Sequence, residues 1–320
     1  MLRFLIGRLI GALIVLLVMS LVIYLLIGLM PGDPIDLMFQ ADPTLTPEDL
    51  AQLRAVYGLD QPLLSRYAAW LGNALQGDFG FSRSYRQPVL EILAPRMVNT
   101  LWLMGISFVL SLAIAIPLGV LAAIRQNGPL DLGVNVVALA GYSMPVFWLA
   151  LLLIYLFAVD LAWLPAGGSG IDAQTLWGKA QFLVLPVAAL TLTGLGAITR
   201  FTRGEMIEAL RQDYVRTARA KGLSYRRVVM GHAFRNAMIP VVTIVALGFG
   251  TLVSGALVVE TMFGYLGMGK LMFDSILAND YNVALVGLLI ATLLTLVANI
   301  IADIAYAALD PRIRYGGGPA

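Results

Sequence analysis

The sequence contains no cysteine and a single histidine, His232. The lack of cysteine excludes disulfides, thiol catalysis and thiolate metal sites. A single histidine excludes both a metal centre with several histidine ligands and a metalloprotease helix of the HExxH type. The chemistry of this chain therefore depends neither on thiols nor on a histidine-rich metal site.

Charged residues are also scarce, at 12% of the 320 residues, and the formal net charge is only +2. Hydrophobic residues make up 59% of the chain, and the mean hydropathy is +0.85. This balance is far from that of soluble domains and is typical of a membrane protein. The small net charge gives no indication of nucleic-acid binding.

Six long apolar stretches meet the requirement of about 20 residues for a membrane-spanning helix. The stretches are 9–30, 99–124, 132–159, 182–201, 239–260 and 283–308. The first could be mistaken for a secretory signal, but it is too long for the apolar part of one. MPGDP also follows it in place of a small-x-small cleavage site. We therefore expect an all-α membrane protein with six transmembrane helices, of which the first is retained.

The distribution of positive charge predicts the orientation of these spans. Six spans place both termini on one side, and 14 of the 21 Lys and Arg residues fall on that side. Five of the other seven lie in one long loop, 31–98, where charge has little influence on orientation. We expect a multi-pass protein of the bacterial inner membrane with both termini in the cytoplasm.

The long loop between the first two spans contains two helical patterns. TPEDLAQLRAVYG, 46–58, predicts a helix with Thr46 as the N-cap and Gly58 at its end. QPLLSRYAAWLGNALQG, 61–77, places apolar residues at helical spacing. These patterns favour a small helical cap outside the membrane, although a solvated loop with short helices remains an alternative.

The stretch 200–239 carries nine Lys and Arg residues against three acidic ones. Membrane topology alone explains the sign of this charge but not the order of the residues. GEMIEALRQDYVRTARAKG predicts a helix that ends with Gly222 at the C′ position. Ser224 then suits the N-cap of a second helix, SYRRVVMGHAFRNAM. The pattern therefore predicts a helix, a glycine turn and a second helix on the cytoplasmic face.

This pattern resembles the EAA loop of binding-protein-dependent ABC importer permeases. ARAKGLS followed by HAFRNAMIP is similar to the oligopeptide, dipeptide, nickel and glutathione permease subfamily. Arg216 stands where the broad pattern has its glutamate, and the interval from Gly222 to Pro240 is longer than in the sugar permeases. The peptide subfamily resembles this chain in both respects. The likeness extends to PGDP (31–34), GLDQP (58–62), GDFGFS (77–82), LPAGG (164–168), VVETMFGYLGMGKL (258–271) and LDPRIRY (309–315).

The resemblance implies the fold of a type I importer permease over 1–320, with an extracytoplasmic helical loop, 31–98, and a cytoplasmic coupling loop, 202–238. It further implies a coupling helix around 217–228 that sits in a cleft of an ATPase subunit, where Leu223 fills a pocket. The coupling residues that it implies are Arg216, Thr217, Ala218, Arg219, Ala220, Lys221, Gly222, Leu223, Ser224, Arg226 and Arg227. The implied partners are a homologous second permease, two cytoplasmic ATPases, an extracytoplasmic solute-binding protein and membrane lipid, but no nucleic acid.

One segment matches the start of a nucleotide-binding P-loop. GYLGMGK, 264–270, fits GxxxxGK, but Leu271 follows where a Ser or Thr is needed for magnesium. No β-strand precedes it, and the expected topology places it outside the cell. We therefore expect no nucleotide site, metal site or catalytic residue on this chain, so ATP and magnesium bind to the partner ATPases. We interpret His232 as a structural or docking residue.

The transport pathway and the substrate are less well specified. Tyr142, Ser143 and Met144 lie beside Pro145 and are weak candidates for positions that face a central pathway, because small and polar span residues more often serve helix packing. Glu260, Asp160 and Asp303 fall near span ends, which disfavours an ion-coupled secondary transporter. That transporter remains a distant alternative. The resemblance implies ATP-driven import of peptides or similar small solutes by alternating access, with nickel chelates, glutathione and opines as alternatives.

Overall fold

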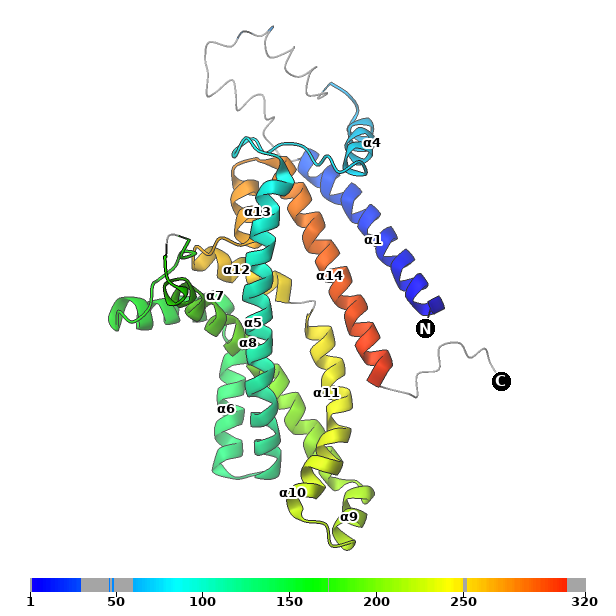
Figure 1. Ribbon diagram of the computed structural model, residues 1–320, viewed down its shortest axis with the longest axis vertical. Helices are drawn as coiled ribbons and strands as arrows, with labels where there is room; N and C mark the ends of the chain where they lie inside the picture. The colour runs from blue at the N-terminus through cyan, green and yellow to red at the C-terminus, as the bar shows by residue number, and fades with distance from the viewer. Residues whose placement is uncertain are drawn as a thin grey trace. The chain divides into compact units, whose positions relative to one another are not determined.

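The computed structural model describes residues 2–29, 46, 48, 60–171, 173–249 and 252–309. These residues form helices and turns, with an isolated β-bridge between Phe81 and Pro88 (Figure 1). The α-helices are α1 (Leu2–Gly28), α4 (Leu63–Ala74), α5 (Val89–Ile124), α6 (Pro129–Ser143), α7 (Val146–Leu153), α8 (Leu176–Arg211), α9 (Asp213–Ala220), α10 (Tyr225–Val228), α11 (Phe234–Phe249), α12 (Leu252–Met262), α13 (Met268–Leu277) and α14 (Tyr281–Leu309). Two π-helical segments, η1 (Ile154–Asp160) and η2 (Val229–Ala233), follow α7 and α10.

Five of the described helices are long and apolar enough to cross a membrane. The helix α6 and the helical segment made of α7 and η1 form a bent pair. When this pair is counted as one span, it is the sixth. The all-α fold with six spans is therefore confirmed. The predicted helix over 61–77 forms as α4, whereas the predicted helix over 46–58 lies almost entirely outside the described residues.

The predicted third span, 132–159, is not one continuous helix. Its first part is α6, and its second part is α7 together with η1. The two parts are bent by 107° relative to each other. Pro145 causes the break, because proline lacks a backbone N–H and disfavours helical geometry in the residue before it. Met144 is accordingly extended, with φ −78° and ψ 130°.

The stretch predicted as the fifth span contains two helices. The first, α11, runs through Pro240 to Phe249, and α12 begins at Leu252. The apolar helical segment that is long enough to span starts at Tyr225, so it includes residues that the sequence assigned to the basic stretch. The helix leading into this span is thus continuous with part of the basic stretch.

The chain divides into two compact units. One is built from Val98–Lys270 and Leu294–Ala320, and the other from Leu2–Met97 and Leu271–Leu293. In the second unit, α4 packs on α1 through the rings of Tyr24, Tyr67 and Trp70 and a hydrogen bond of 2.8 Å between the hydroxyls of Ser20 and Tyr67.

The first unit has two hydrophobic clusters. The upper cluster packs α7, α8 and α12 against one another and contains Leu103, Leu149, Ala150, Leu153, Leu185, Val187, Ala189, Leu190, Val259, Phe263 and Tyr265. The elbow cluster joins α5 and α8 to α9, α10, η2 and α11 and contains Val120, Ala123, Met206, Ala209, Val215, Ala218, Val228, Val229, Ala233 and Ala237. The elbow, residues 212–233, is therefore anchored to the helices on either side of it.

Candidate functional site

The turn of the elbow follows the last turn of α9 (Figure 1). Gly222 has φ +79° and its N–H donates to the Arg219 carbonyl over 2.9 Å, while the Leu223 N–H donates to the Ala218 carbonyl over 3.3 Å. These bonds are those of a Schellman motif with glycine at C′, which satisfies the last carbonyls of the helix. The C′ assignment of Gly222 made from the sequence agrees with this geometry.

The second helix of the elbow begins at Tyr225, directly after Ser224. The Val228 N–H donates to the Ser224 carbonyl over 3.0 Å, but the Ser224 side chain makes no capping hydrogen bond. The sequence therefore placed the start of the helix correctly and attributed it to a side-chain contact that is not formed.

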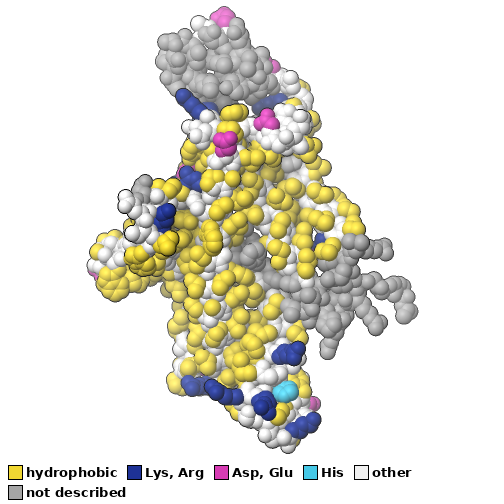
Figure 2. All heavy atoms as spheres, viewed as in Figure 1, with side chains coloured by type: hydrophobic (Ala, Val, Ile, Leu, Met, Phe, Trp, Pro, Cys, Tyr) yellow, Lys and Arg dark blue, Asp and Glu magenta, His cyan; other side chains and the backbone are white. Residues whose placement is uncertain are grey.

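The two faces of the elbow differ sharply in exposure. Val215, Ala218, Val228 and Val229 are buried in the elbow cluster. All the cations of the coupling set are exposed, and Lys and Arg side chains gather over α9 and α10 (Figure 2). The exposed members of the set are Arg216, Thr217, Arg219, Ala220, Lys221, Gly222, Ser224, Arg226 and Arg227. Burying its apolar side on its own chain leaves the elbow with a basic face toward solvent.

Leu223 contacts its own chain at the turn. Its place in a pocket of a partner protein stays a prediction. The side chain is half-buried and packs against the elbow cluster. This contact is the hydrophobic interaction that accompanies a Schellman motif. Leu223 therefore holds the turn on α9 from within the elbow.

Beside the elbow is a surface hollow of about 790 Å³. Ile124 lines one wall of the hollow, and the others are lined by Ser224, Tyr225, Arg226, Arg227, Val229, Met230 and Gly231. The hollow combines two guanidinium groups with apolar side chains. A partner surface that bears both acidic and apolar groups would fit it.

His232 and Tyr214 lie at the edges of the same region. The carbonyl of His232 accepts a hydrogen bond of 2.8 Å from the Asn236 amide, and its side chain is half-buried. Burial raises the pKa of Tyr214, although a hydrogen bond with Asn236 partly opposes the shift. Tyr214 is therefore neutral at physiological pH, so the charge of the elbow comes from its Lys and Arg residues.

The GYLGMGK segment forms a closed turn around a buried carboxylate. Glu260 of α12 is fully buried. Its Oε1 accepts a hydrogen bond of 2.5 Å from the Thr100 hydroxyl, and its Oε2 accepts one of 3.0 Å from the Lys270 N–H. The Thr100 hydroxyl also accepts from the Met268 N–H over 2.8 Å. The segment thus wraps around a carboxylate of its own chain.

Two glycines of this segment are required by close approach. A Cβ on Gly267 would overlap the Glu260 carboxylate, and one on Gly269 would lie 2.6 Å from the Leu257 Cα. Tyr265 closes the turn, and burial together with the negative charge of Glu260 raises the pKa of Tyr265 to about 12. In the sequence alone, Glu260 is only a charge near a span end. The three glycines that follow it in quick succession were the signal that it is enclosed.

The weak candidates for a transport pathway lie at the α6–α7 bend. Tyr142 and Ser143 are exposed, whereas Met144 is half-buried and packs against the upper cluster. These contacts set Met144 apart from its two neighbours, and the role of all three in a pathway stays a prediction.

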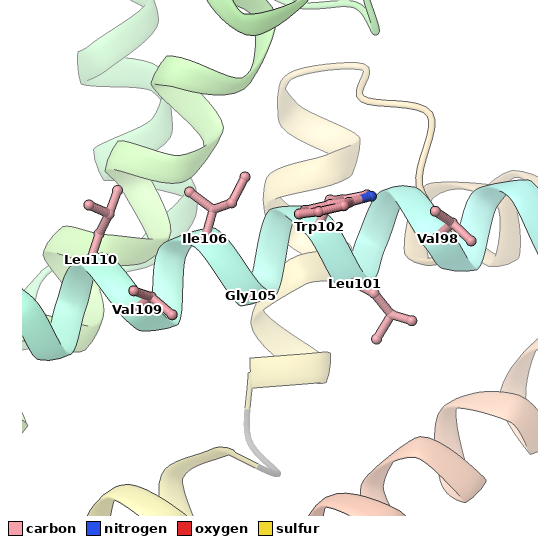
Figure 3. Close-up of a pocket in the computed structure, with 7 residues that line it drawn as sticks. All are labelled: Val98, Leu101, Trp102, Gly105, Ile106, Val109 and Leu110. Atoms are coloured by element: carbon pink, nitrogen blue, oxygen red, sulfur yellow. The ribbon is translucent and has the colours of Figure 1, made fainter.

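A groove of about 620 Å³ runs along one face of α5 (Figure 3). It is lined by Val98, Leu101, Trp102, Gly105, Ile106, Val109 and Leu110. Its lining is apolar apart from the indole nitrogen of Trp102, so it offers a polar solute very few hydrogen bonds. Among the residues that the structure describes, no group of three or more His, Asp and Glu side chains could hold a metal ion.

The long apolar helices and the basic helical elbow are features of a multi-span membrane protein. Residues 115–315 match the family described as the binding-protein-dependent transport system inner membrane component, and residues 1–104 match the N-terminal part of such components. The chain belongs to this family, as a permease of the oligopeptide, dipeptide, nickel and glutathione subfamily of ABC importers.

Relatives of known name cover nearly all of the chain. It is 42% identical to the oligopeptide transport system permease protein AppB of Bacillus subtilis, over 89% of this chain and 90% of that one. It is 35% identical to the dipeptide transport system permease protein DppB of Escherichia coli K12, over 98% and 99%. It is 39% identical to the glutathione transport system permease protein GsiC of Escherichia coli O1:K1, over 98% and 100%.

Solved structures share the fold. The MetNI methionine ABC transporter in an inward-facing conformation matches with a TM-score of 0.57 at 18% identity, over 69% of this chain and 97% of that one. An amino acid ABC transporter crystallised with histidines matches with a TM-score of 0.53 at 14% identity, over 68% and 94%. These similarities confirm the type I importer architecture.

Proposed function

We propose that this permease imports peptides or chemically similar small solutes, and that its elbow is the site at which ATPase subunits drive the transport cycle. The elbow is the observation that carries this proposal, because it buries its apolar side in its own chain and exposes a row of cations. The names of the relatives, which include oligopeptide, dipeptide and glutathione permeases, support the substrate class.

In this proposal, the coupling residues act in two ways. Arg219, Lys221, Arg226 and Arg227 pair with acidic residues of an ATPase, since guanidinium and ammonium groups at an interface favour carboxylate partners. The buried residues of the elbow, together with Leu223, hold α9 and α10 as one body. Movement of the ATPase is then passed to α8 and α11 as a rigid-body displacement.

The energy source lies on other subunits. Two cytoplasmic ATPases would bind ATP and magnesium, a second homologous permease would complete the pathway, and an extracytoplasmic binding protein would deliver the solute. ATP-driven closure of the ATPases would open the pathway outward, and their release would return it inward. The whole chain, 1–320, would act as one permease domain, with Tyr142, Ser143 and Met144 along the pathway.

The orientation follows from the same role. Both termini and the elbow lie in the cytoplasm of a bacterium, and the loop that contains α4 lies outside the inner membrane. The charge distribution supports this orientation, because short cytoplasmic loops are enriched in Lys and Arg.

The test is to reverse the charge of the second elbow helix in the complete complex. Arg226→Glu combined with Arg227→Glu should reduce the amount of ATPase that copurifies with the permease by about tenfold or more, because acidic partner groups would then face like charges. The copurified ATPase is quantified by gel densitometry, and ATP hydrolysis is measured in the same samples.

The matched control reverses two other exposed arginines. Arg200→Glu combined with Arg235→Glu changes the net charge by the same amount outside the coupling set, and should leave assembly within about twofold of wild type. Equal losses in both double variants would refute a specific role for the elbow. Solute uptake that persists without any ATPase would instead favour an ion-coupled transporter.

A further inference from the structure

The start of α6 carries a buried carboxylate that the proposed function does not use. Asp131 is 3% exposed, and its Oδ1 and Oδ2 accept hydrogen bonds from Nε and Nη2 of Arg203 in α8, over 2.5 and 2.7 Å. The Asn127 N–H donates to Oδ2 over 2.9 Å, and the Asn135 amide donates to Oδ1 over 2.7 Å. Every oxygen of the carboxylate therefore has two donors, which compensates for the loss of water.

Backbone contacts along the same two helices require glycine. A Cβ on Gly196 of α8 would overlap the Ala138 carbonyl of α6, and a Cβ on Gly141 of α6 would lie 2.8 Å from the Leu192 carbonyl of α8. Helices that approach this closely have one register in which their surfaces fit. Sliding α6 along α8 would break these contacts and leave the charge of Asp131 buried without Arg203.

The pair of helices connects two features of the first unit. The elbow begins directly after α8 ends at Arg211, and the residues of α8 that follow Arg203 contribute Met206 and Ala209 to the elbow cluster. At the other end of α6, the chain bends by 107° into α7 at Met144 and Pro145. A displacement of α8 at the elbow reaches this bend through α6 when α6 moves with α8, beside the direct packing of α7 on α8 in the upper cluster.

We propose that Asp131 and Arg203 are positioning residues that make α6 move with α8 during the transport cycle. The inference rests on the proposed function, because it supplies the next step after the elbow. A bidentate guanidinium–carboxylate pair fixes both the distance and the relative orientation of its two helices, which a single contact does not. The ion pair thus transmits the displacement of the elbow to the bend between α6 and α7.

The test uses the complete complex, reconstituted in proteoliposomes with its ATPases, second permease and binding protein. Asp131→Asn keeps the shape of the side chain and removes its charge. It should reduce the stimulation of ATP hydrolysis by the binding protein about 3- to 30-fold, while assembly and unstimulated hydrolysis stay within about twofold of wild type. A purely structural role would lower assembly and both rates of hydrolysis together, and that result would overturn the inference.

Distances between spin labels give a second readout, which the lack of native cysteine makes straightforward. Labels at Val137→Cys in α6 and Gly204→Cys in α8 lie at exposed positions. With ATP and vanadate, their separation should stay unchanged in an otherwise wild-type chain and should shift and broaden when Asp131→Asn is added. An unchanged separation in both chains would overturn the inference.

Two further variants guard against misfolding. Asp131→Asn combined with Arg203→Gln leaves no buried charge unpaired, and it should assemble normally yet show the reduced stimulation. Arg203→Lys keeps the charge without the planar fork and should give an intermediate loss. Gly204→Ala is the matched control, because a Cβ at Gly204 meets nothing within 4 Å and should leave coupling intact.

The outcomes separate this inference from the proposed function. A wild-type complex in which no ATPase copurifies or responds to the binding protein would refute the function, and the inference with it. A wild-type complex that is fully coupled, together with fully coupled Asp131→Asn and double variants, would refute the inference alone.

Discussion

Two glycine turns in the same unit differ in where they place charged side chains: one exposes them to solvent and the other buries them. In the elbow, Gly222 follows α9 and the surrounding cations are exposed to solvent. In the segment after α12, Gly267 and Gly269 approach the fully buried carboxylate of Glu260. Gly222 is needed for its positive φ, and a Cβ there would meet nothing within 4 Å. Gly267 is needed because a Cβ would occupy space that the carboxylate fills.

The difference separates charges that are exposed to solvent from a charge that is hydrogen-bonded within its own chain. Around Glu260, the Thr100 hydroxyl and the Lys270 N–H come from the same chain, so the charge needs no other protein. On the elbow, the ion pair between Arg216 and Asp213 spans 3.5 Å and both side chains are highly exposed, so it contributes little. The exposed cations of the elbow are available to a partner.

The largest effect on stability is expected at Gly267. Gly267→Val would force a branched side chain into the space of the Glu260 carboxylate and should lower stability by roughly 4 kcal/mol. Thermal unfolding in detergent, followed by intrinsic fluorescence, measures the loss. An apparent unfolding midpoint within a few degrees of wild type would show that the turn around Glu260 can open to admit a side chain. Gly267 would then not be required by close approach.

A slightly smaller effect is expected at Thr100. Thr100→Val removes the hydroxyl that donates to Glu260 and accepts from the Met268 N–H, so two buried groups lose a partner, at a cost of about 3 kcal/mol. Thr100→Ser keeps the hydroxyl and is the control. Equal thermal stability of the two variants would contradict the role of this hydrogen bond.

Alkaline pH should destabilise the Glu260 turn through Tyr265. The pKa of Tyr265 is raised to about 12, above an unfolded value of about 10, so its neutral form stabilises the fold fully below pH 10. That contribution, about 2 kcal/mol, is lost as the pH rises from 10 to 12. Tyr265→Phe should flatten this fall in the unfolding midpoint, and a parallel fall in both proteins would exclude Tyr265 as its cause.

The smallest effect on stability is expected at Gly222. Gly222→Ala must adopt a positive φ and should cost about 1 kcal/mol, with no steric clash. Gly231→Ala is the control, because a Cβ there also meets nothing and its backbone is helical. If Gly222→Ala destabilised the chain as strongly as Gly267→Val, conformational freedom would not explain the elbow glycine.

Local signals in the sequence predicted much of the fold and of the elbow. Gly222 and Ser224 marked the turn because helix ends are decided by a few neighbouring residues, and Pro145 marked the bend as a special position. The angle of the bend within 132–159 could not be predicted, because it depends on how α6 and α7 each pack on α8 as well as on the effect of Pro145 on Met144. The packing of Leu223 on the elbow cluster could not be predicted, because nothing local in the sequence indicates it.

The sequence by itself determined the membrane environment, the six apolar stretches, the sign of the elbow charge and the position of its turn. These properties depend on composition and on residues close in the chain. Tertiary structure alone decided that Glu260 is enclosed by Thr100 and the glycine turn, and that Asp131 pairs with Arg203. Both contacts join residues far apart in sequence. The partner of a buried charge is therefore set by how the helices that carry the two residues pack together.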